Sequence, residues 1–278
     1  MVAVVELTEG PGTGGAYAKA ALGLLPGRRR DDALPDVELV RRGVTVDRDH
    51  LARYDRVCGL RLTDALPATY PHVLAFPLAM RLMSAPGFPL PMIGLVHVSN
   101  RITVLRPIDA GVRLDLTVRA AGLRDHPRGR QFDMLATASA DGVQVWRGVS
   151  TYLRKTSSGP GPDAPDPLPA AGSVWRLGPR VGTEYAAVSG DRNPIHTSRL
   201  GARLFGFPRP IAHGMWTKAR CLAALEGRLP SAYTVEVAFK QPILLPSTVR
   251  FTSSPANAGC EFTVHGKRPH LTGTITPG

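Results

Sequence analysis

Hydrophobic positions in the last third of the chain predict one long helix. Apolar residues recur there at the three- and four-residue spacing of a helix with one buried face, over residues 213–228. They are Met215, Ala219, Leu222 and Leu225. A shorter pattern of the same kind covers residues 73–83, where Pro77 interrupts it because proline removes a backbone donor from a helix interior. Short helices are predicted to begin near Asp47 and near Gly182.

Runs rich in β-branched and aromatic residues follow both helical regions and predict strands. The first set spans residues 97–105, 113–123, 130–140 and 143–153. The second set spans residues 233–240, 248–253, 260–265 and 270–276. The dipeptide Asp141-Gly142 predicts a tight hairpin turn between two of these strands. A helix followed by consecutive antiparallel strands is typical of an α+β fold in which a sheet wraps around the helix.

The two parts of this pattern are similar in sequence. Residues 100–117 (NRITVLRPIDAGVRLDLT) align with residues 235–252 (VEVAFKQPILLPSTVRFT), so that Pro107 falls on Pro242. We therefore expect two copies of one fold. Between them, residues 154–173 are dense in Pro, Gly, Ser and Asp, as linkers are. The predicted divisions are an N-terminal tail (1–36) with one candidate short helix (17–25), a first domain (37–155), a linker (156–173) and a second domain (174–278).

Composition narrows the class of protein. The chain has 278 residues, 43% of them hydrophobic and 20% charged, which is ordinary for a folded protein and excludes wholesale disorder. No stretch approaches the roughly 18 apolar residues of a membrane helix, and we expect neither a membrane span nor a secretory signal. Three widely spaced cysteines fit neither a disulfide framework nor a zinc site, so a reducing compartment, the cytoplasm, is expected.

The net charge of +12 suits a polyanionic partner, but it does not identify one. Only five of the 34 basic residues are lysines, and the sequence has no zinc-finger spacing and no aromatic RNA-binding pattern. We therefore do not expect nucleic-acid binding. A small anionic ligand, such as a thioester carrier that bears phosphate, is equally compatible with this charge.

The most informative segment is YAAVSGDRNPIHTSRLGARLFGFPRPIAHGM, residues 185–215. Asp191 and His196 would diverge on a continuous helix, but Pro194 prevents one and favours a loop in which both side chains can converge. An Asp and a His that share one water form a general acid–base unit. Gly214 opens the predicted long helix, where an unobstructed N–H and the helix dipole favour negative charge, as in an oxyanion hole.

Each of these residues also has a plain structural interpretation. Asp191 alone is typical of a turn, and His213 alone is typical of a helix cap. The pairing of Asp191 with His196 in one short loop, before a glycine that opens a helix, favours the catalytic interpretation. Nearby basic residues could contact carrier phosphates, although a solvated position suits each of them as well. They are Arg203, Arg209, Lys218 and Lys240.

SGDRNPIH followed by IAHGM resembles the hydratase 2 motif of the MaoC-like (R)-specific enoyl-thioester hydratases, which have the hot-dog fold. The duplicated layout resembles the double hot-dog (3R)-hydroxyacyl-thioester dehydratases of actinobacterial fatty-acid metabolism. The resemblance implies an α+β tandem hot-dog fold, with antiparallel sheets each wrapped around a long helix. The implied reaction is reversible syn addition of water to a trans-2-enoyl thioester of coenzyme A or of a carrier protein. It requires neither a metal nor a redox cofactor.

The resemblance also implies residue roles. Asp191 and His196 would bind and activate the water, and the Gly214 N–H would polarise the thioester carbonyl. Asn193 would steady the loop, and with His213 it belongs to the expected substrate-binding set. That set also includes Arg203 and Lys240. How Asp191 and His196 divide proton donation and abstraction stays open.

The first copy lacks the acid–base pair, because the alignment places Leu60 opposite Asp191 and Thr69 opposite His196. We therefore predict one active site per chain, with space in the first copy for a long acyl chain. A continuous sheet through both copies is expected, so that the monomer, or a homodimer of it, is the functional unit. Two alternatives stay open: a hot-dog thioesterase and a non-catalytic acyl-thioester binding subunit.

Overall fold

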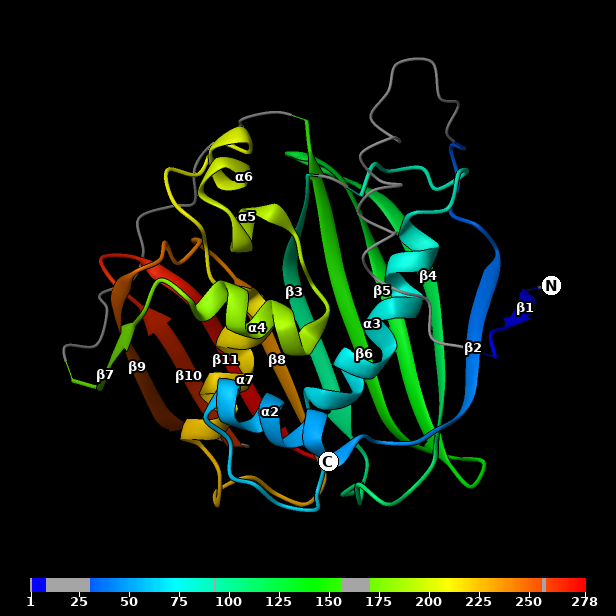
Figure 1. The fold of residues 1–278 in the computed structure, drawn as a ribbon, viewed down its shortest axis with the longest axis horizontal. Helices are drawn as coiled ribbons and strands as arrows, with labels where there is room; N and C mark the ends of the chain where they lie inside the picture. The colour runs from blue at the N-terminus through cyan, green and yellow to red at the C-terminus, as the bar shows by residue number, and fades with distance from the viewer. Residues whose placement is uncertain (1, 9–30, 93, 157–170, 257–258) are drawn as a thin grey trace.

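The computed structural model describes residues 2–8, 31–92, 94–156, 171–256 and 259–278. In these residues one curved sheet of eleven strands lies behind a layer of helices (Figure 1). The strand order is β1-β2-β4-β5-β6-β3-β8-β11-β10-β9-β7. β1 runs parallel to β2, and the other neighbouring strands of the described sheet are antiparallel.

The first half of the sheet holds the strands β1 (Ala3–Glu6), β2 (Val37–Val44), β3 (Leu95–Val104), β4 (Leu114–His126), β5 (Gly129–Ala140) and β6 (Val143–Lys155). Its helices are α2 (Arg48–Cys58) and α3 (Tyr70–Met83). The second half holds β7 (Ser173–Leu177), β8 (Tyr233–Phe239), β9 (Ser247–Ala256), β10 (Gly259–His265) and β11 (Pro269–Pro277). Its helices are α4 (Val181–Ser189), α5 (Pro194–Thr197), α6 (Arg199–Leu204) and α7 (Gly214–Ala224).

The two halves join through their central strands. β3 pairs with β8, and Ile102 lies opposite Val235. The hydroxyl groups of Thr103 and Thr234 form a hydrogen bond of 2.9 Å across this pair of strands. Ile102 and Val235 are fully buried, so the core passes through the junction. The predicted continuous sheet is confirmed.

The long helix of each half lies against the curved sheet, α3 in the first half and α7 in the second (Figure 1). α3 is longer than residues 73–83 and continues through Pro77. Most of its side chains are buried in the core, and this packing outweighs the one backbone hydrogen bond that proline removes. α7 is shorter than predicted, because the chain leaves the helix at Leu225 and turns through Gly227 at a positive φ of 82°.

Other differences concern the ends of the predicted divisions. β1 lies in the segment assigned to the N-terminal tail, and it pairs with β2. β2 and β7 have no counterpart among the predicted strands. The candidate helix at residues 17–25 and the centre of the predicted linker, residues 157–170, lie outside the described residues. Among the described helices, none has both the length and the apolar character needed to cross a membrane.

Candidate active site

The residues of the motif meet where α4 ends. α4 terminates at Gly190, whose φ of 75° turns the chain sharply. The carboxylate of Asp191 then accepts a hydrogen bond from the backbone N–H of Asn193 at 3.2 Å. The side-chain oxygen of Asn193 in turn accepts one from Ile195 N–H at 3.3 Å and caps α5. Two consecutive turns of this kind fix the loop, and Pro194 begins α5 at the position where its missing donor costs nothing.

His196 lies on α5 and is 9% exposed. Its Nδ1 is 2.8 Å from the carbonyl oxygen of Ile211. Because a carbonyl oxygen only accepts, Nδ1 carries the proton, and in the neutral ring Nε2 keeps its lone pair. Burial lowers the pKa of His196 below its ordinary value, although the nearby Asp191 carboxylate acts in the opposite direction. The protein therefore holds His196 as a neutral ring with an available basic nitrogen.

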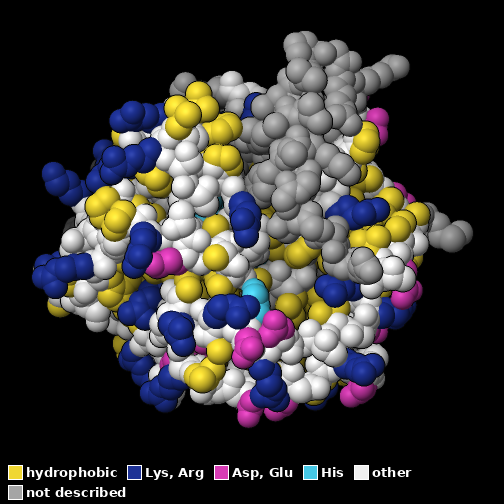
Figure 2. All heavy atoms as spheres, in the orientation of Figure 1, with side chains coloured by type: hydrophobic (Ala, Val, Ile, Leu, Met, Phe, Trp, Pro, Cys, Tyr) yellow, Lys and Arg dark blue, Asp and Glu magenta, His cyan; other side chains and the backbone are white. Residues whose placement is uncertain are grey.

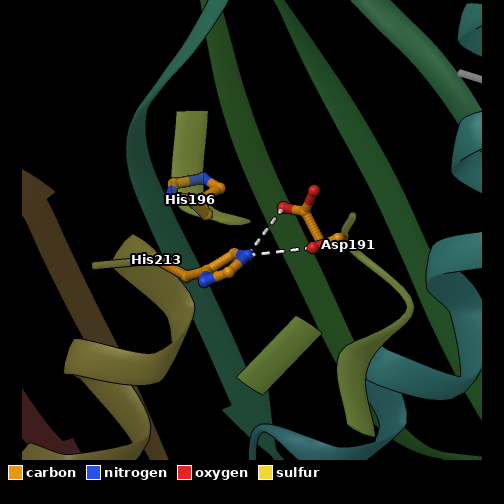
Figure 3. A group of neighbouring side chains, drawn as sticks. All are labelled: Asp191, His196 and His213. Atoms are coloured by element: carbon orange, nitrogen blue, oxygen red, sulfur yellow. Dashed lines mark hydrogen bonds and ion pairs between the residues drawn. The ribbon is translucent and has the colours of Figure 1, made fainter. Parts of the chain in front are cut away.

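His213 connects the loop to α7 (Figure 3). Its ring stacks on that of His196 with 3.6 Å between centroids. Its Nε2–H donates to the backbone oxygen of Asp191 at 3.0 Å and lies 3.9 Å from the carboxylate. Burial, with the adjacent His196, lowers the pKa of His213 to about 3, so this ring stays neutral as well. His213 thus positions Asp191 against His196.

Asp191, His196 and His213 are also the group of side chains that best fits a metal among the described residues, since their ligand atoms lie within 4.8 Å of one another. The stacked rings argue against such a site, because the lone pair of an imidazole nitrogen lies in its ring plane. Two nearly parallel rings direct their lone pairs alongside each other rather than toward one point. His213 also uses Nε2 to donate to a backbone oxygen. The arrangement suits proton transfer better than metal binding.

Two glycines leave space that the site needs. A Cβ on Gly182 of α4 would lie 2.1 Å from the backbone oxygen of His196, so only glycine lets α4 approach α5 this closely. A Cβ on Gly214 would lie 2.8 Å from the ring of Phe239. Gly214 is the first residue of α7, where backbone N–H groups lack partners within the helix and the helix dipole is positive.

The predicted basic residues fall into two groups. Arg203, Arg209 and Lys240 are exposed, as phosphate contacts would be. Lys218 is fully buried, so its predicted role as a phosphate contact is wrong. Its ammonium group donates to the side chain and the backbone oxygen of Asn100 and to Val235 O, at 2.6, 3.2 and 3.0 Å. Three acceptors satisfy the three N–H bonds, and Lys218 thereby ties α7 to β3 and β8.

The structure corrects the alignment of the first copy with the site. Leu60 follows the left-handed Gly59 at the end of α2 as Asp191 follows Gly190, as predicted. Thr69 does not correspond to His196, because it directly precedes α3 as His213 precedes α7. The short connection of residues 60–69 therefore stands in place of residues 191–213, and within this connection, which is described throughout, no helix corresponds to α5 or α6.

A small cavity of about 10 Å³ lies in the first half, between α3 and strands β4 to β6. Its lining includes Ala75, Phe76, Ala79, Val118, Met134, Ala136 and Gly148. Polar groups lie at one part of the wall, contributed by His72, Ser150 and Tyr152. Burial, with the nearby Lys218 charge, lowers the pKa of His72 to about 4, although the Asp191 carboxylate acts in the opposite direction. His72 is therefore a neutral ring at this wall.

The sequence analysis missed several residues around the site. Tyr185 contacts the ring of His213, with 4.9 Å between centroids. His97 stacks on Tyr152 at 4.7 Å and contacts Phe239 at 4.9 Å, so it lies between the cavity wall and Gly214. Tyr185 is the first residue of the quoted motif, and this position in the sequence could have identified it. His97 and Tyr152 meet only through strand pairing, which no local pattern reveals.

Known proteins resemble this chain in sequence. The family profile described as "MaoC like domain" matches residues 164–265, which contain the whole loop from Asp191 to Gly214. The chain is 39% identical over 266 residues to 3-hydroxyacyl-thioester dehydratase X of Mycobacterium tuberculosis, covering 92% of this chain and 95% of that protein. It is 27% identical over 189 residues to 3-hydroxyacyl-thioester dehydratase Y of the same organism, covering 59% of this chain and 64% of that protein.

Solved structures extend the comparison. The crystal structure of HtdX from Mycobacterium tuberculosis superimposes with a TM-score of 0.78 at 37% identity, covering 87% of this chain and 100% of that chain. A MaoC-like dehydratase from Phytophthora capsici shares the fold, with a TM-score of 0.69 at 17% identity, covering 87% of this chain and 95% of that chain. The expected α+β tandem hot-dog fold is confirmed. Because the similarity to dehydratase X extends over nearly the full length of both proteins, the chain belongs to the MaoC-like family.

Proposed function

We propose that this protein catalyses the reversible hydration of trans-2-enoyl thioesters to (3R)-hydroxyacyl thioesters, and acts as a dehydratase in fatty-acid metabolism. The observation that carries the proposal is the buried His196, whose ring lies beside the Asp191 carboxylate, within 4.8 Å between their polar atoms, near the start of α7. The name and 39% identity of dehydratase X support the same reaction.

In the hydration direction, Asp191 and His196 hold one water between them. The Nε2 of His196 takes a proton from this water as its oxygen bonds to C3 of the enoyl group. The same proton then passes from Nε2 to C2, and the C2–C3 double bond becomes single. Because one group takes and returns the proton on one face, the addition is syn. Asp191 orients the water and stabilises the imidazolium that forms between the two steps.

The N–H of Gly214 donates to the thioester oxygen, where negative charge develops as water adds to C3. Its place at the first turn of α7 adds the positive end of the helix dipole to this stabilisation. Phe239 lies directly beneath Gly214, so a side chain here would displace either the ring or the carbonyl of the substrate.

The remainder of the substrate extends in two directions from this point. The acyl chain is directed toward the cavity beneath α3, which measures about 10 Å³ as it stands, so its lining side chains move apart to admit the chain. The phosphates of the carrier contact exposed basic side chains, Arg203 on α6 and Lys240 after β8. Asn193 and His213 position the loop between these two parts.

The remaining expectations are part of the same proposal. We place one active site in each chain and take the double hot dog, alone or as a homodimer, to be the catalytic unit. The reaction uses no metal or redox cofactor. Thioester substrates of coenzyme A or of a carrier protein, together with three free cysteines, fit a cytoplasmic enzyme.

The test is a spectrophotometric assay with crotonyl-CoA and with C8 to C12 trans-2-enoyl-CoA. Hydration removes the absorbance of the conjugated enoyl thioester, and chiral analysis of the product identifies the (3R) isomer. The expected result is conversion to the (3R)-hydroxy product. A product of (3S) configuration would overturn the assignment. Release of free thiol without loss of the double bond would instead identify a thioesterase.

A further inference from the structure

Helix α6 has an unusual distribution of side chains. Leu200 and Leu204, one helical turn apart, are 70% and 75% exposed, and Phe205 follows at 38%. We call these three residues the α6 patch. Figure 2 shows hydrophobic side chains gathered over the position of α6, with Lys and Arg side chains beside them. Large apolar side chains this exposed and this close together are a feature of interaction surfaces.

The packing of α6 explains why the patch faces solvent. Gly201 lies against Pro194 so closely that a Cβ would be 2.4 Å from the proline side chain, and Ala202 is fully buried. The helix therefore buries its smallest residues and exposes its leucines, the reverse of an ordinary amphipathic surface helix. The fold of this chain gains nothing from leucine at positions 200 and 204.

The charge around the patch has one sign. Residues 191–213 contain one acidic residue, Asp191, and its carboxylate lies within the site. The segment contains four arginines, all exposed: Arg192, Arg199, Arg203 and Arg209. A surface that is apolar at its centre and basic at its rim complements an acidic partner with an apolar stripe.

Hydrogen bonds of Ser198 connect the helix that carries the α6 patch to the helix that carries His196. Ser198 ends α5, where its N–H donates to Pro194 O at 3.0 Å. Its hydroxyl also begins α6, accepting from Gly201 N–H at 3.2 Å. α5 carries His196, so a partner bound to α6 lies at the rim of the site, within the span of a prosthetic arm.

We propose that the α6 patch docks an acidic acyl carrier protein, which presents the enoyl or hydroxyacyl group on its phosphopantetheine arm; this rests on the function proposed above. The arginine rim and the leucines together favour this partner over free coenzyme A. Coenzyme A brings phosphates for the arginines but has no apolar protein surface for Leu200 and Leu204. A helix of the carrier protein supplies both.

The experiment compares one acyl group on two carriers. The same trans-2-enoyl group is loaded on coenzyme A and on the acyl carrier proteins of the genome that encodes this chain, and kcat/KM is measured for each. The variants are L200S/L204S and R199E. The control is L62S, which alters a leucine that is 73% exposed in the connection between α2 and α3.

We expect L200S/L204S to lower kcat/KM for a carrier-protein substrate by at least about tenfold, and to leave that for the coenzyme A substrate within about twofold. R199E is expected to act in the same direction with a smaller effect, and to weaken the salt dependence of the carrier-protein reaction. L62S is expected to change neither.

Other outcomes overturn the docking proposal. An equal fall with both substrates would mean that α6 acts only by positioning His196. If the unaltered protein converts only the coenzyme A substrate, the docking proposal is refuted and the proposed function stands. If it converts neither substrate, both proposals are refuted. Loss of a dimer in L200S/L204S by analytical ultracentrifugation would assign the patch to a second copy. If the unaltered protein sediments with phosphatidylglycerol vesicles and L200S/L204S does not, the α6 patch binds a membrane surface instead.

Discussion

The two halves of the molecule begin in the same way and then diverge. α2 and α4 each bury a tyrosine, Tyr54 and Tyr185, and each ends in a left-handed glycine. After that glycine, residues 60–69 lead directly to α3, whereas residues 191–213 form α5 and α6 before α7. The sheet and the long helix are common to both halves. The proposed chemistry is therefore assigned to one connection, not to the fold that both halves share.

The residue before each long helix shows what the difference means. Tyr54 donates its hydroxyl to Thr69 at 2.7 Å in the first half, and Tyr185 contacts the ring of His213 in the second. The threonine hydroxyl closes a buried hydrogen bond and does nothing further. His213 instead stacks on His196 and donates to the backbone oxygen of Asp191, so the same position belongs to the proposed proton-transfer site.

Removing the acid–base pair should have the largest effect. Asp191→Asn and His196→Gln keep the size of each side chain but abolish its charge or its basic nitrogen. We expect each to lower kcat for enoyl-CoA hydration by about 10²- to 10⁴-fold, the usual contribution of a positioned acid–base group. The measurement is loss of enoyl-thioester absorbance at saturating substrate.

The matched control for this pair lies in the first half. Leu60→Asn places an amide at the position that corresponds to Asp191. Its kcat should stay within about threefold of the unaltered enzyme, since the one carboxylate of residues 60–69, Asp64, is exposed and paired with Arg48. A loss comparable to that of Asp191→Asn would mean that both halves contribute chemistry.

Gly214→Ala should have the next largest effect. The new methyl group would lie 2.8 Å from the ring of Phe239 and would shift the first turn of α7 away from the thioester oxygen. We expect kcat to fall by about 10²-fold, as when one oxyanion donor is lost. The double variant Gly214→Ala/Phe239→Ala removes the clash and should recover part of kcat. Failure to recover would point to the Cβ obstructing the substrate itself.

The pH dependence of kcat/KM should follow His196. Neutral His196 is the active form in hydration, and burial lowers its pKa. The neutral form therefore persists as pH falls through about 6.5, the ordinary histidine pKa. Activity should stay level to below that pH and then decline about tenfold per pH unit. A decline that begins above pH 6.5 would contradict a desolvated base at this position.

The smallest predicted effect is on the free energy of unfolding, and it comes from a difference between α2 and α4. Asp55 is 1% exposed, its carboxylate oxygens have no hydrogen-bond partner among the described residues, and α4 has Ala186 at the corresponding position. Burial, with repulsion from Glu226, raises the pKa of Asp55 to about 7. Since the unfolded value is about 4, the folded state retains this proton between those values, and the free energy of unfolding falls as pH rises from about 4 to about 7.

We therefore expect Asp55→Ala to raise the free energy of unfolding at pH 8 by about 1 to 3 kcal/mol, because it removes a buried, unpaired carboxylate. The gain should shrink toward pH 4. Urea denaturation at both pH values measures it. Lower stability at pH 8 would show that Asp55 has a stabilising partner.

Local patterns in the sequence predicted most of the fold and the centre of the site. The strands after each long helix and the Asp141-Gly142 turn, where both residues have positive φ, follow from short-range preferences. Asp191 and His196 converge because α4 ends at the left-handed Gly190 and Pro194 begins a new helix, and both are local effects.

The two misassignments have different causes, a contact distant in sequence and an insertion. The ammonium group of Lys218 donates a hydrogen bond to Asn100 on β3, so the burial of Lys218 depends on how α7 packs against the other half. The apolar face formed by Met215 and Leu222 includes position 218, and that spacing was the one available signal. Thr69 was misaligned because residues 191–213 contain two extra helices, and sequence similarity in so short a stretch cannot show where an insertion begins.

The pairing of β3 with β8 inside one chain has an evolutionary consequence. In a dimer of identical subunits, every substitution appears twice, so a change that suits one half is imposed on the other. Here each half is encoded separately, and selection can act on them independently. The second half was free to elaborate a connection for proton transfer, while the first was free to discard it and keep the space beneath α3. The two halves can therefore differ because their sequences change independently, although they share one fold.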